Sequence, residues 1–380
     1  MFSLLVLFPL GLLALTFIVV IHELGHFIAA KRSGVFVEEF GVGLPPRIWG
    51  KRIGETLYSI NALPLGGFVK LHGETMEEKT SDPKRSFSNK AGLTRAFIAL
   101  AGIFMNFVLA FVCFTIVYSI EGVQTLKETE IVKITNISTN SPAQVAGMLV
   151  EDVIKTANGK DIKTPSEFIS LVNENKGKRV KIIIERKIGE SVEEKVFSVT
   201  PRENPPENEG ALGVAISNVV VETYYPPLWK RPIVGVSLGL QNTIAFTKEV
   251  LGGFAQISKD VSAGKAPVGF VGPVGILAVF AEVLKRGFVD MFNFIGIVSL
   301  NLALFNLIPF PPLDGSRVVF VLIEKIIGKR FLPRIEAIAH STGMILLIIL
   351  MLFITGREIP KLINSSSLSG FVDSLAPTED

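Results

Sequence analysis

The sequence predicts a multi-pass α-helical membrane protein with four transmembrane helices, a membrane-associated β-hairpin and an extracytoplasmic α/β domain. First, 48% of the 380 residues are hydrophobic and the mean hydropathy is +0.47, which is too apolar for an ordinary soluble protein. Second, four uncharged stretches of 20 to 25 residues are long enough to cross a bilayer. They are Phe2–Ile21, Ala96–Ile120, Met291–Leu313 and Ala337–Gly356. Third, the long polar stretch between the second and third has the alternation and turn residues of a small α/β domain.

The distribution of basic residues predicts the orientation. Residues 31–95 carry eleven Lys and Arg and residues 314–336 carry five, whereas the N-terminus has none. The positive-inside rule therefore places both basic loops in the cytoplasm and residues 121–289 outside, with both termini. The first apolar stretch lacks a basic leader and a small-residue cleavage site, so we interpret it as a span rather than a signal peptide.

His22-Glu23-Leu24-Gly25-His26 directly follows the first apolar stretch. Residues four apart share one face of a helix, so both imidazoles can bind one metal ion. HExxH is a signature of zinc hydrolases, although it also arises by chance. Its place at the end of a span predicts hydrolysis at or inside the membrane. The single cysteine lies in an apolar stretch, so the metal must rely on His, Asp or Glu.

A second polar group follows the third apolar stretch. Three prolines between residues 309 and 312 should end the helix and turn Asp314 inward. Two histidines and one carboxylate, with a fourth position open to water, form a catalytic zinc site. The alternative for Asp314 is a helix cap or a surface carboxylate. Placing the polar side chains of Asn301 and Asn306 against lipid would cost energy, so they usually face protein or water and indicate function. Their alternative role is hydrogen bonding between helices.

Residues 38–74 are rich in glycine and proline and lack helical periodicity. Short strands are expected at 47–51 and 56–60, around a turn at 52–55. The hairpin of residues 46–60 could pair with an extended substrate, because an exposed strand edge is a template for a peptide backbone. The alternative is a plain cytoplasmic hairpin.

Residues 127–200 have the pattern of a compact α/β module. Asn158-Gly159 is a hairpin turn, and Thr164 with Glu167 forms a capping box with proline between them. The segment SPAQVAGMLVEDVIKTANGKDI resembles the circularly permuted PDZ domains of bacterial proteases, in one copy. The resemblance implies that this domain binds an extended peptide or a C-terminus as an added strand. The alternative is a structural domain without a ligand.

Several motifs together resemble the site-2 protease family of intramembrane zinc metalloproteases, in particular the bacterial regulator-of-sigma-E type. They are HELGH at 22–26, FGVGLPPRIWG at 40–50, PLGGFVKLHGE at 64–74, GPVGI at 272–276 and NLIPFPPLDG at 306–315. The resemblance implies a multi-pass protein of the bacterial inner membrane whose active site faces the cytoplasm. It also implies regulated intramembrane proteolysis of single-span proteins, such as anti-sigma factors or remnant signal peptides. The sigma-E regulators carry two PDZ domains, so one copy here departs from that pattern.

On this basis, His22, His26 and Asp314 would hold Zn²⁺, and Glu23 would act as the catalytic base. Four residues of the segment before Asp314 are assigned to substrate binding: Asn301, Asn306, Pro309 and Pro311. His72 is interpreted as structural and His340 as buried or interfacial. An inactive binding protein is disfavoured by the intact motifs, and a metal transporter by the few polar residues in the spans.

We expect five parts along the chain. Residues 1–120 hold two spans and the hairpin, 121–215 the PDZ-like domain, 216–289 an amphipathic connection, 290–360 two further spans and 361–380 a disordered tail. The expected partners are single-span substrates, a peptide at the PDZ-like domain and the lipid bilayer. Without a basic cluster interleaved with aromatic residues, no nucleic acid is expected.

Overall fold

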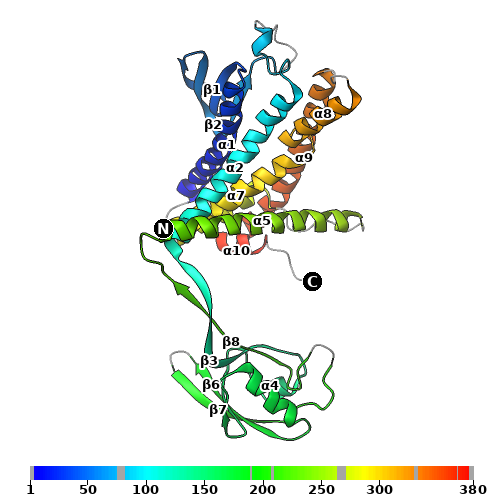
Figure 1. Cartoon of the computed structure of the whole chain (residues 1–380). Helices are drawn as coiled ribbons and strands as arrows, with labels where there is room; N and C mark the ends of the chain where they lie inside the picture. The colour runs from blue at the N-terminus through cyan, green and yellow to red at the C-terminus, as the bar shows by residue number, and fades with distance from the viewer. Residues whose placement is uncertain are drawn as a thin grey trace. The chain divides into compact units, whose positions relative to one another are not determined.

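A computed structural model describes residues 4–74, 82–188, 191–206, 209–262, 271–328, 333–365 and 367–375 (Figure 1). The chain forms two compact units. The membrane unit comprises Met1–Glu121 and Pro226–Asp380, and the β unit comprises Gly122–Tyr225. The expected boundary at residue 215 is therefore wrong by about ten residues, because the last strand of the β unit continues to Tyr224.

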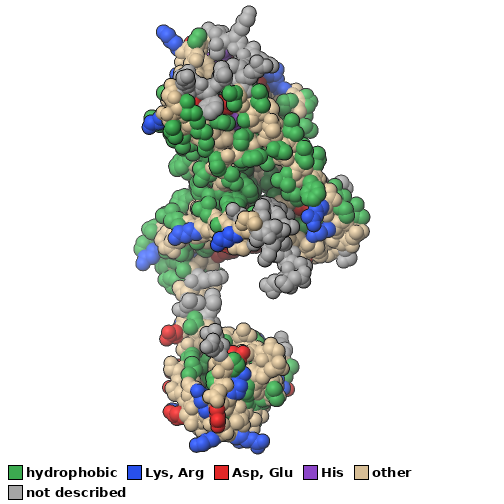
Figure 2. All heavy atoms as spheres, turned by 90° about the vertical axis from the view of Figure 1, so that its right-hand side faces the viewer, with side chains coloured by type: hydrophobic (Ala, Val, Ile, Leu, Met, Phe, Trp, Pro, Cys, Tyr) green, Lys and Arg blue, Asp and Glu red, His purple; other side chains and the backbone are tan. Residues whose placement is uncertain are grey.

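Four described helices are long and apolar enough to cross a membrane, as the four uncharged stretches predict. They are α1 (Leu4–Arg32), α2 (Gly92–Glu121), α7 (Phe288–Leu307) and α9 (Pro333–Asn364). Ile18 of α1, Cys113 of α2 and Ile295 of α7 share one buried cluster, so these three helices pack together. Figure 2 shows the apolar covering of the membrane unit and the mixed, charged surface of the β unit.

The third span is shorter than the apolar stretch that predicts it. Helix α7 ends at Leu307, and the chain turns through residues 308–313 before α8 (Asp314–Ile327) begins. The prolines in this turn cannot continue the helix, because each lacks a backbone N–H and fixes its own φ. Helix α8 was not predicted, since its apolar residues, 318–323 and 326–327, are too few to span a bilayer and fall within the basic loop.

Three more helices complete the membrane unit: α5 (Arg231–Ser262), α6 (Pro273–Arg286) and α10 (Leu368–Asp373). Helix α5 lies within the expected amphipathic connection of residues 216–289, and it crosses α2 closely at Gly235 and Gly239. The predicted disorder of the tail is wrong for residues 361–364 and 368–373, which are helical. Buried Phe371 anchors α10, a contact that the Ser-rich composition conceals. Residues 376–380 of that prediction lie outside the described residues.

The hairpin is longer than predicted and comprises β1 (Val37–Ile53) and β2 (Thr56–Leu71). Both strands bend, so each contributes two segments to one small sheet. Residues 37–42 lie between residues 57–60 on one side and residues 67–71 on the other, while residues 49–53 pair with 56–60. Residues 67–71 are consequently an edge of this sheet within the described part of the chain.

The β unit is one antiparallel sheet with two short helices. Its strands are β3 (Val123–Ile137), β4 (Val153–Ala157), β5 (Lys160–Asp161), β6 (Val180–Ile188), β7 (Ser191–Val199) and β8 (Val214–Tyr224), in the order β7-β6-β4-β3-β8 with β5 beside β4. Helices α3 (Pro142–Val145) and α4 (Pro165–Glu174) cover an apolar core that includes Ile154, Phe168 and Ile182. The predicted capping box is confirmed, since both of its hydrogen bonds form.

Candidate active site

The two histidines of HExxH lie one turn apart on α1. No proline lies in or near the motif and the single glycine, Gly25, is tolerated, so α1 runs unbroken through the motif to Arg32. The side chains of His22 and His26 are only 7% and 13% exposed. Their Nε2 atoms are 3.1 Å apart, so both rings point toward one place.

Asp314 reaches the same place from near the other end of the chain. The turn after α7 makes it the first residue of α8. Its Oδ2 lies 2.9 Å from Nε2 of His22 and 3.2 Å from Nε2 of His26. Among the described residues, the structure brings these three together as a group that could hold a metal ion.

The donor set fits Zn²⁺. Tetrahedral zinc with bonds of about 2.0–2.1 Å places its ligand atoms roughly 3.3 Å apart, close to the separations of 2.9, 3.1 and 3.2 Å found here. Nδ1 of His26 lies 2.8 Å from the carbonyl oxygen of Ile98, so the neutral ring donates there and leaves Nε2 free.

Two glycines allow α1 and α2 to approach closely at this site. A side chain on Gly25 would strike the carbonyl group of Ala101. A Cβ on Gly102 would lie 2.5 Å from Nε2 of His26 and 2.9 Å from Cε1 of His22. Substitution of Gly102 would therefore displace the metal-binding rings or occupy their space.

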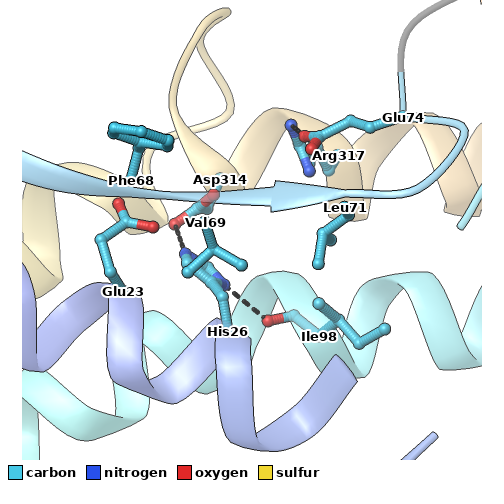
Figure 3. A pocket seen from close by; sticks show the side chains of 9 residues that line it. All are labelled: Glu23, His26, Phe68, Val69, Leu71, Glu74, Ile98, Asp314 and Arg317. Carbon is cyan, nitrogen blue, oxygen red and sulfur yellow. Dashed lines mark hydrogen bonds and ion pairs between the residues drawn. The ribbon is translucent and has the colours of Figure 1, made fainter. Parts of the chain in front are cut away.

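A cavity of about 200 Å³ opens beside the three donor atoms (Figure 3). Its lining comes from α1, the end of β2, α2 and α8: Glu23, His26, Phe68, Val69, Leu71, Glu74, Ile98, Asp314 and Arg317. The carboxyl group of Glu23 points toward the same side as that of Asp314 (Figure 3). The carboxyl groups of Glu23 and Asp314 and the imidazole of His26 thus line one cavity.

The cavity is covered by the strand edge at residues 67–71, whereas the sequence pointed to residues 46–60. Phe68, Val69 and Leu71 line it, and no residue of 46–60 does. The strand passes over α1 at Glu23 and His26 (Figure 3). Gly67 packs tightly there, because a Cβ would lie 3.2 Å from Val20 and 3.7 Å from Glu23.

An ion pair joins this strand to the helix that carries Asp314. Arg317, one turn after Asp314, pairs with Glu74, just beyond the end of β2. The guanidinium also lies 5.5 Å from the ring centroid of Phe87. Burial opposes the charge of Arg317, but Glu74 and Asp314 outweigh it and raise the pKa of Arg317 above its usual value.

The four predicted substrate-binding residues do not line this cavity. The amide of Asn301 donates to the carbonyl of Ile297 on its own helix at 3.0 Å, so this bond does not join two helices, unlike the alternative considered from the sequence. Asn306 and Pro311 are half-buried and Pro309 is exposed. Pro311 instead contacts α9, where a Cβ on Gly343 would strike its carbonyl group.

The two remaining histidines lie apart from the donor set. Nδ1 of His72 bonds to Glu38 at 2.8 Å, and its backbone bonds to Phe36 and Phe87, in line with a structural role. His340 is half-buried on α9 near Phe320.

Sequence reasoning missed several residues that build the site. Asn106 of α2 is fully buried, with its amide nitrogen 3.2 Å from Nδ1 of His22. A lone asparagine inside an apolar span was a usable signal, because such residues usually face protein. Residues 67–71, Ile98 and Arg317 carried no comparable signal, since their role depends on tertiary contacts.

Comparisons with known proteins agree with this geometry. Residues 10–350 match the model of peptidase family M50. The chain is 34% identical to a predicted zinc metalloprotease of Clostridium acetobutylicum over 93% of this chain and 98% of that protein. It is 28% identical to the regulator of sigma-W protease RasP of Bacillus subtilis over 91% of this chain and 96% of that protein. It is 31% identical to the chloroplastic membrane metalloprotease ARASP of Arabidopsis thaliana over 90% of this chain and 76% of that protein.

The match covers both HExxH on α1 and Asp314 at the start of α8, and it continues through most of α9. With four apolar helices and three convergent donor atoms, the sequence and the structure lead to one assignment. The chain belongs to peptidase family M50 and is a zinc metalloendopeptidase of the membrane.

Proposed function

We propose that proteolysis takes place in the cavity beside Glu23, with His22, His26 and Asp314 as the zinc ligands. This proposal is based on one observation. Donor atoms from α1 and from the start of α8 converge to within 4.8 Å of one another next to the Glu23 carboxyl group. The cavity lies among helices that are apolar enough to span a bilayer, which suits a substrate cleaved within its own span.

The chain's own residues supply most of the mechanism. Bound zinc would contribute Lewis-acid activation of a water molecule and of the scissile carbonyl group. Glu23 removes a proton from the attacking water and passes it to the amine of the leaving segment. The carbonyl of Ile98 fixes the orientation of His26. Phe68, Val69 and Leu71 cover the cavity and limit the access of other water.

The substrate binds as an added strand along residues 67–71. In the described part of the chain, the strand pairing of this segment is with residues 37–42, and an extended peptide would add to the opposite edge of the sheet. A transmembrane helix must lose part of its hydrogen bonding before cleavage, and strand addition replaces the lost bonds. Asn306, Pro309 and Pro311, which precede Asp314 but do not line the cavity, are proposed to contact substrate residues that flank the scissile bond.

Single-span membrane proteins are the proposed substrates. The B. subtilis relative is named for the regulation of sigma-W, which favours an anti-sigma factor or a remnant signal peptide here. The β unit is proposed to be a PDZ-like domain, because its sheet order and capped α4 agree with the motif at residues 141–162. It binds an extended peptide or a C-terminus, and loss of cleavage on deletion of a substrate's C-terminal residues would test this.

The basic loops favour a cytoplasmic active site and an extracytoplasmic β unit in a bacterial inner membrane. Cysteine labelling with a membrane-impermeant reagent tests this orientation. A cysteine at Val145, which is 83% exposed in the β unit, should react in intact cells, whereas one at Lys51 in the hairpin should not.

Cleavage of a model single-span substrate by purified protein tests the role of Glu23. Glu23→Gln should keep stoichiometric zinc but cleave about 10²–10⁴-fold more slowly, because it loses the proton acceptor and little else. Glu39→Gln, which removes a carboxylate of β1 that does not line the cavity, is the matched control. Wild-type rates in purified Glu23→Gln would overturn the assignment.

A further inference from the structure

Asn106 is a buried polar group whose bonding is incomplete. It lies on α2 with 0% exposure, and its Nδ2 is 3.2 Å from Nδ1 of His22. Its Oδ1 is buried without a hydrogen-bond partner. A buried carbonyl oxygen without a partner loses its hydration and gains nothing in return, so most native structures avoid it.

The chemistry of His22 indicates how this group becomes satisfied. Nε2 of His22 faces Asp314 and His26, so a ligand role for that atom requires the ring proton on Nδ1. Nδ1–H must then donate, and an amide oxygen can accept this proton whereas an amide nitrogen cannot. A 180° rotation of the Asn106 amide brings Oδ1 to Nδ1, where it accepts this proton, and places the amide nitrogen where Oδ1 now lies.

One stripe of α2 serves both histidines. Ile98, Gly102 and Asn106 are spaced four residues apart, so they share a face of the helix. Ile98 accepts from His26, Gly102 leaves space for both rings, and Asn106 lies beside His22. The hydroxyl of Ser299 on α7 donates to the backbone carbonyl of Asn106 at 3.0 Å and fixes this part of α2.

We propose that Asn106 is a positioning residue of the metal site: its side-chain oxygen accepts the Nδ1–H of His22 and holds Nε2 toward the metal. The inference rests on the proposed zinc ligands. Partners of this kind fix the tautomer and orientation of a ligating imidazole and raise its basicity. A purely structural asparagine that bonds two helices together would affect unfolding but not metal affinity.

The test measures zinc affinity by competition with a chelator, and the visible absorption of the Co²⁺-substituted protein. Asn106→Leu keeps the approximate volume but cannot accept a proton. It should weaken zinc binding by about 10–100-fold and alter the cobalt spectrum. Asn106→Asp retains an acceptor oxygen, so it should restore affinity and spectrum close to those of the wild type.

Asn301→Leu is the matched control, because the Asn301 amide bonds to its own helix and should not influence metal affinity. Wild-type zinc affinity in Asn106→Leu would overturn the inference, as would an equal loss in Asn106→Asp. Neither result would affect the zinc ligands themselves. Absence of zinc binding in the wild-type protein would instead overturn the proposed site, and the inference with it.

Discussion

The two units use buried polar side chains for different purposes. In the membrane unit, buried His22 belongs to the proposed metal-donor set and buried Asn106 lies beside it. In the β unit, buried Ser141 caps α3 and buried Asp152 pairs with Arg186 around an apolar core. Removing a polar group should therefore impair chemistry in the first unit and folding in the second. The following experiments test this difference, from the largest expected effect to the smallest.

Loss of one metal ligand should have the largest effect. His26→Ala removes one of three donors, so both zinc and cleavage should be lost while the helices remain folded. Metal content per protein and circular dichroism measure this outcome. His72→Ala is the matched control, because this histidine bonds to Glu38 outside the donor set and its loss should leave zinc bound. Stoichiometric zinc in His26→Ala would contradict the assigned ligand set.

Breaking the buried ion pair of the β unit should affect stability instead. Arg186→Met leaves the carboxylate of Asp152, which is 1% exposed, without its charged partner, at a cost of about 3 kcal/mol. Hydrogen exchange in the full chain should show faster opening of β4 and β6, with zinc content unchanged. Lys127→Met breaks an exposed pair of the same unit and should cost less than about 1 kcal/mol. Equal losses of stability in the two variants would show that the buried ion pair contributes no more than the exposed one.

A smaller effect is expected where α9 meets the turn before Asp314. Gly343→Ala places a methyl group against the backbone of Pro311, so the turn must shift. A displacement of about 1 Å near a catalytic group can reduce the rate by roughly 10²-fold. Gly356→Ala on the same helix has open space and should cleave at the wild-type rate. Similar rates in the two variants would show that the turn tolerates this shift.

The smallest expected effect is the pH dependence of stability that Glu55 contributes at the tip of the hairpin. Hydrogen bonds from Arg85 and then Lys31 lower the pKa of Glu55 from 4.5 to about 2. The folded state favours the ionised form of Glu55, so this group adds to the free energy of unfolding above pH 4.5. The contribution disappears as the pH falls toward 2. Its size is limited by solvent screening, since Glu55 is 40% exposed. Wild type and Glu55→Gln should therefore differ in stability near neutral pH and converge in acid; a constant difference would exclude this cause.

The spans and metal donors could be predicted from sequence because local chemistry specifies them. An uncharged apolar run of sufficient length forms a spanning helix, and a four-residue spacing puts His22 and His26 on one face. The prolines before Asp314 predict the turn that releases it from α7.

The strand over the cavity could not be predicted, because the sheet register decides which part of the hairpin lies there. Residues 46–60 and 67–71 both have strand character, and only pairing with residues 37–42 places the second at Glu23. The position of Asn106 depends similarly on how α1 packs against α2. Helix α8 was missed because its apolar residues, 318–323 and 326–327, are too few to span a bilayer and lie in a basic loop.

Helix α9 is exposed to its surroundings more than the other spans. Only 6% of its most apolar window is buried, against 44% for α2. It nevertheless contacts the turn before Asp314 through Gly343, and buried Glu358 accepts hydrogen bonds from the backbone N–H groups of Gly272 and Gly275 at 2.6 and 3.2 Å.

The thickness of the bilayer should therefore alter the geometry of the proposed active site. A bilayer that is too thick or too thin tilts a span at modest energetic cost. Tilting α9 would press Gly343 against Pro311 or draw it away, which would move the turn that positions Asp314. Cleavage rates measured in vesicles of increasing acyl-chain length should pass through a maximum at the bilayer thickness that matches α9. The surrounding lipid would then regulate the activity of the enzyme.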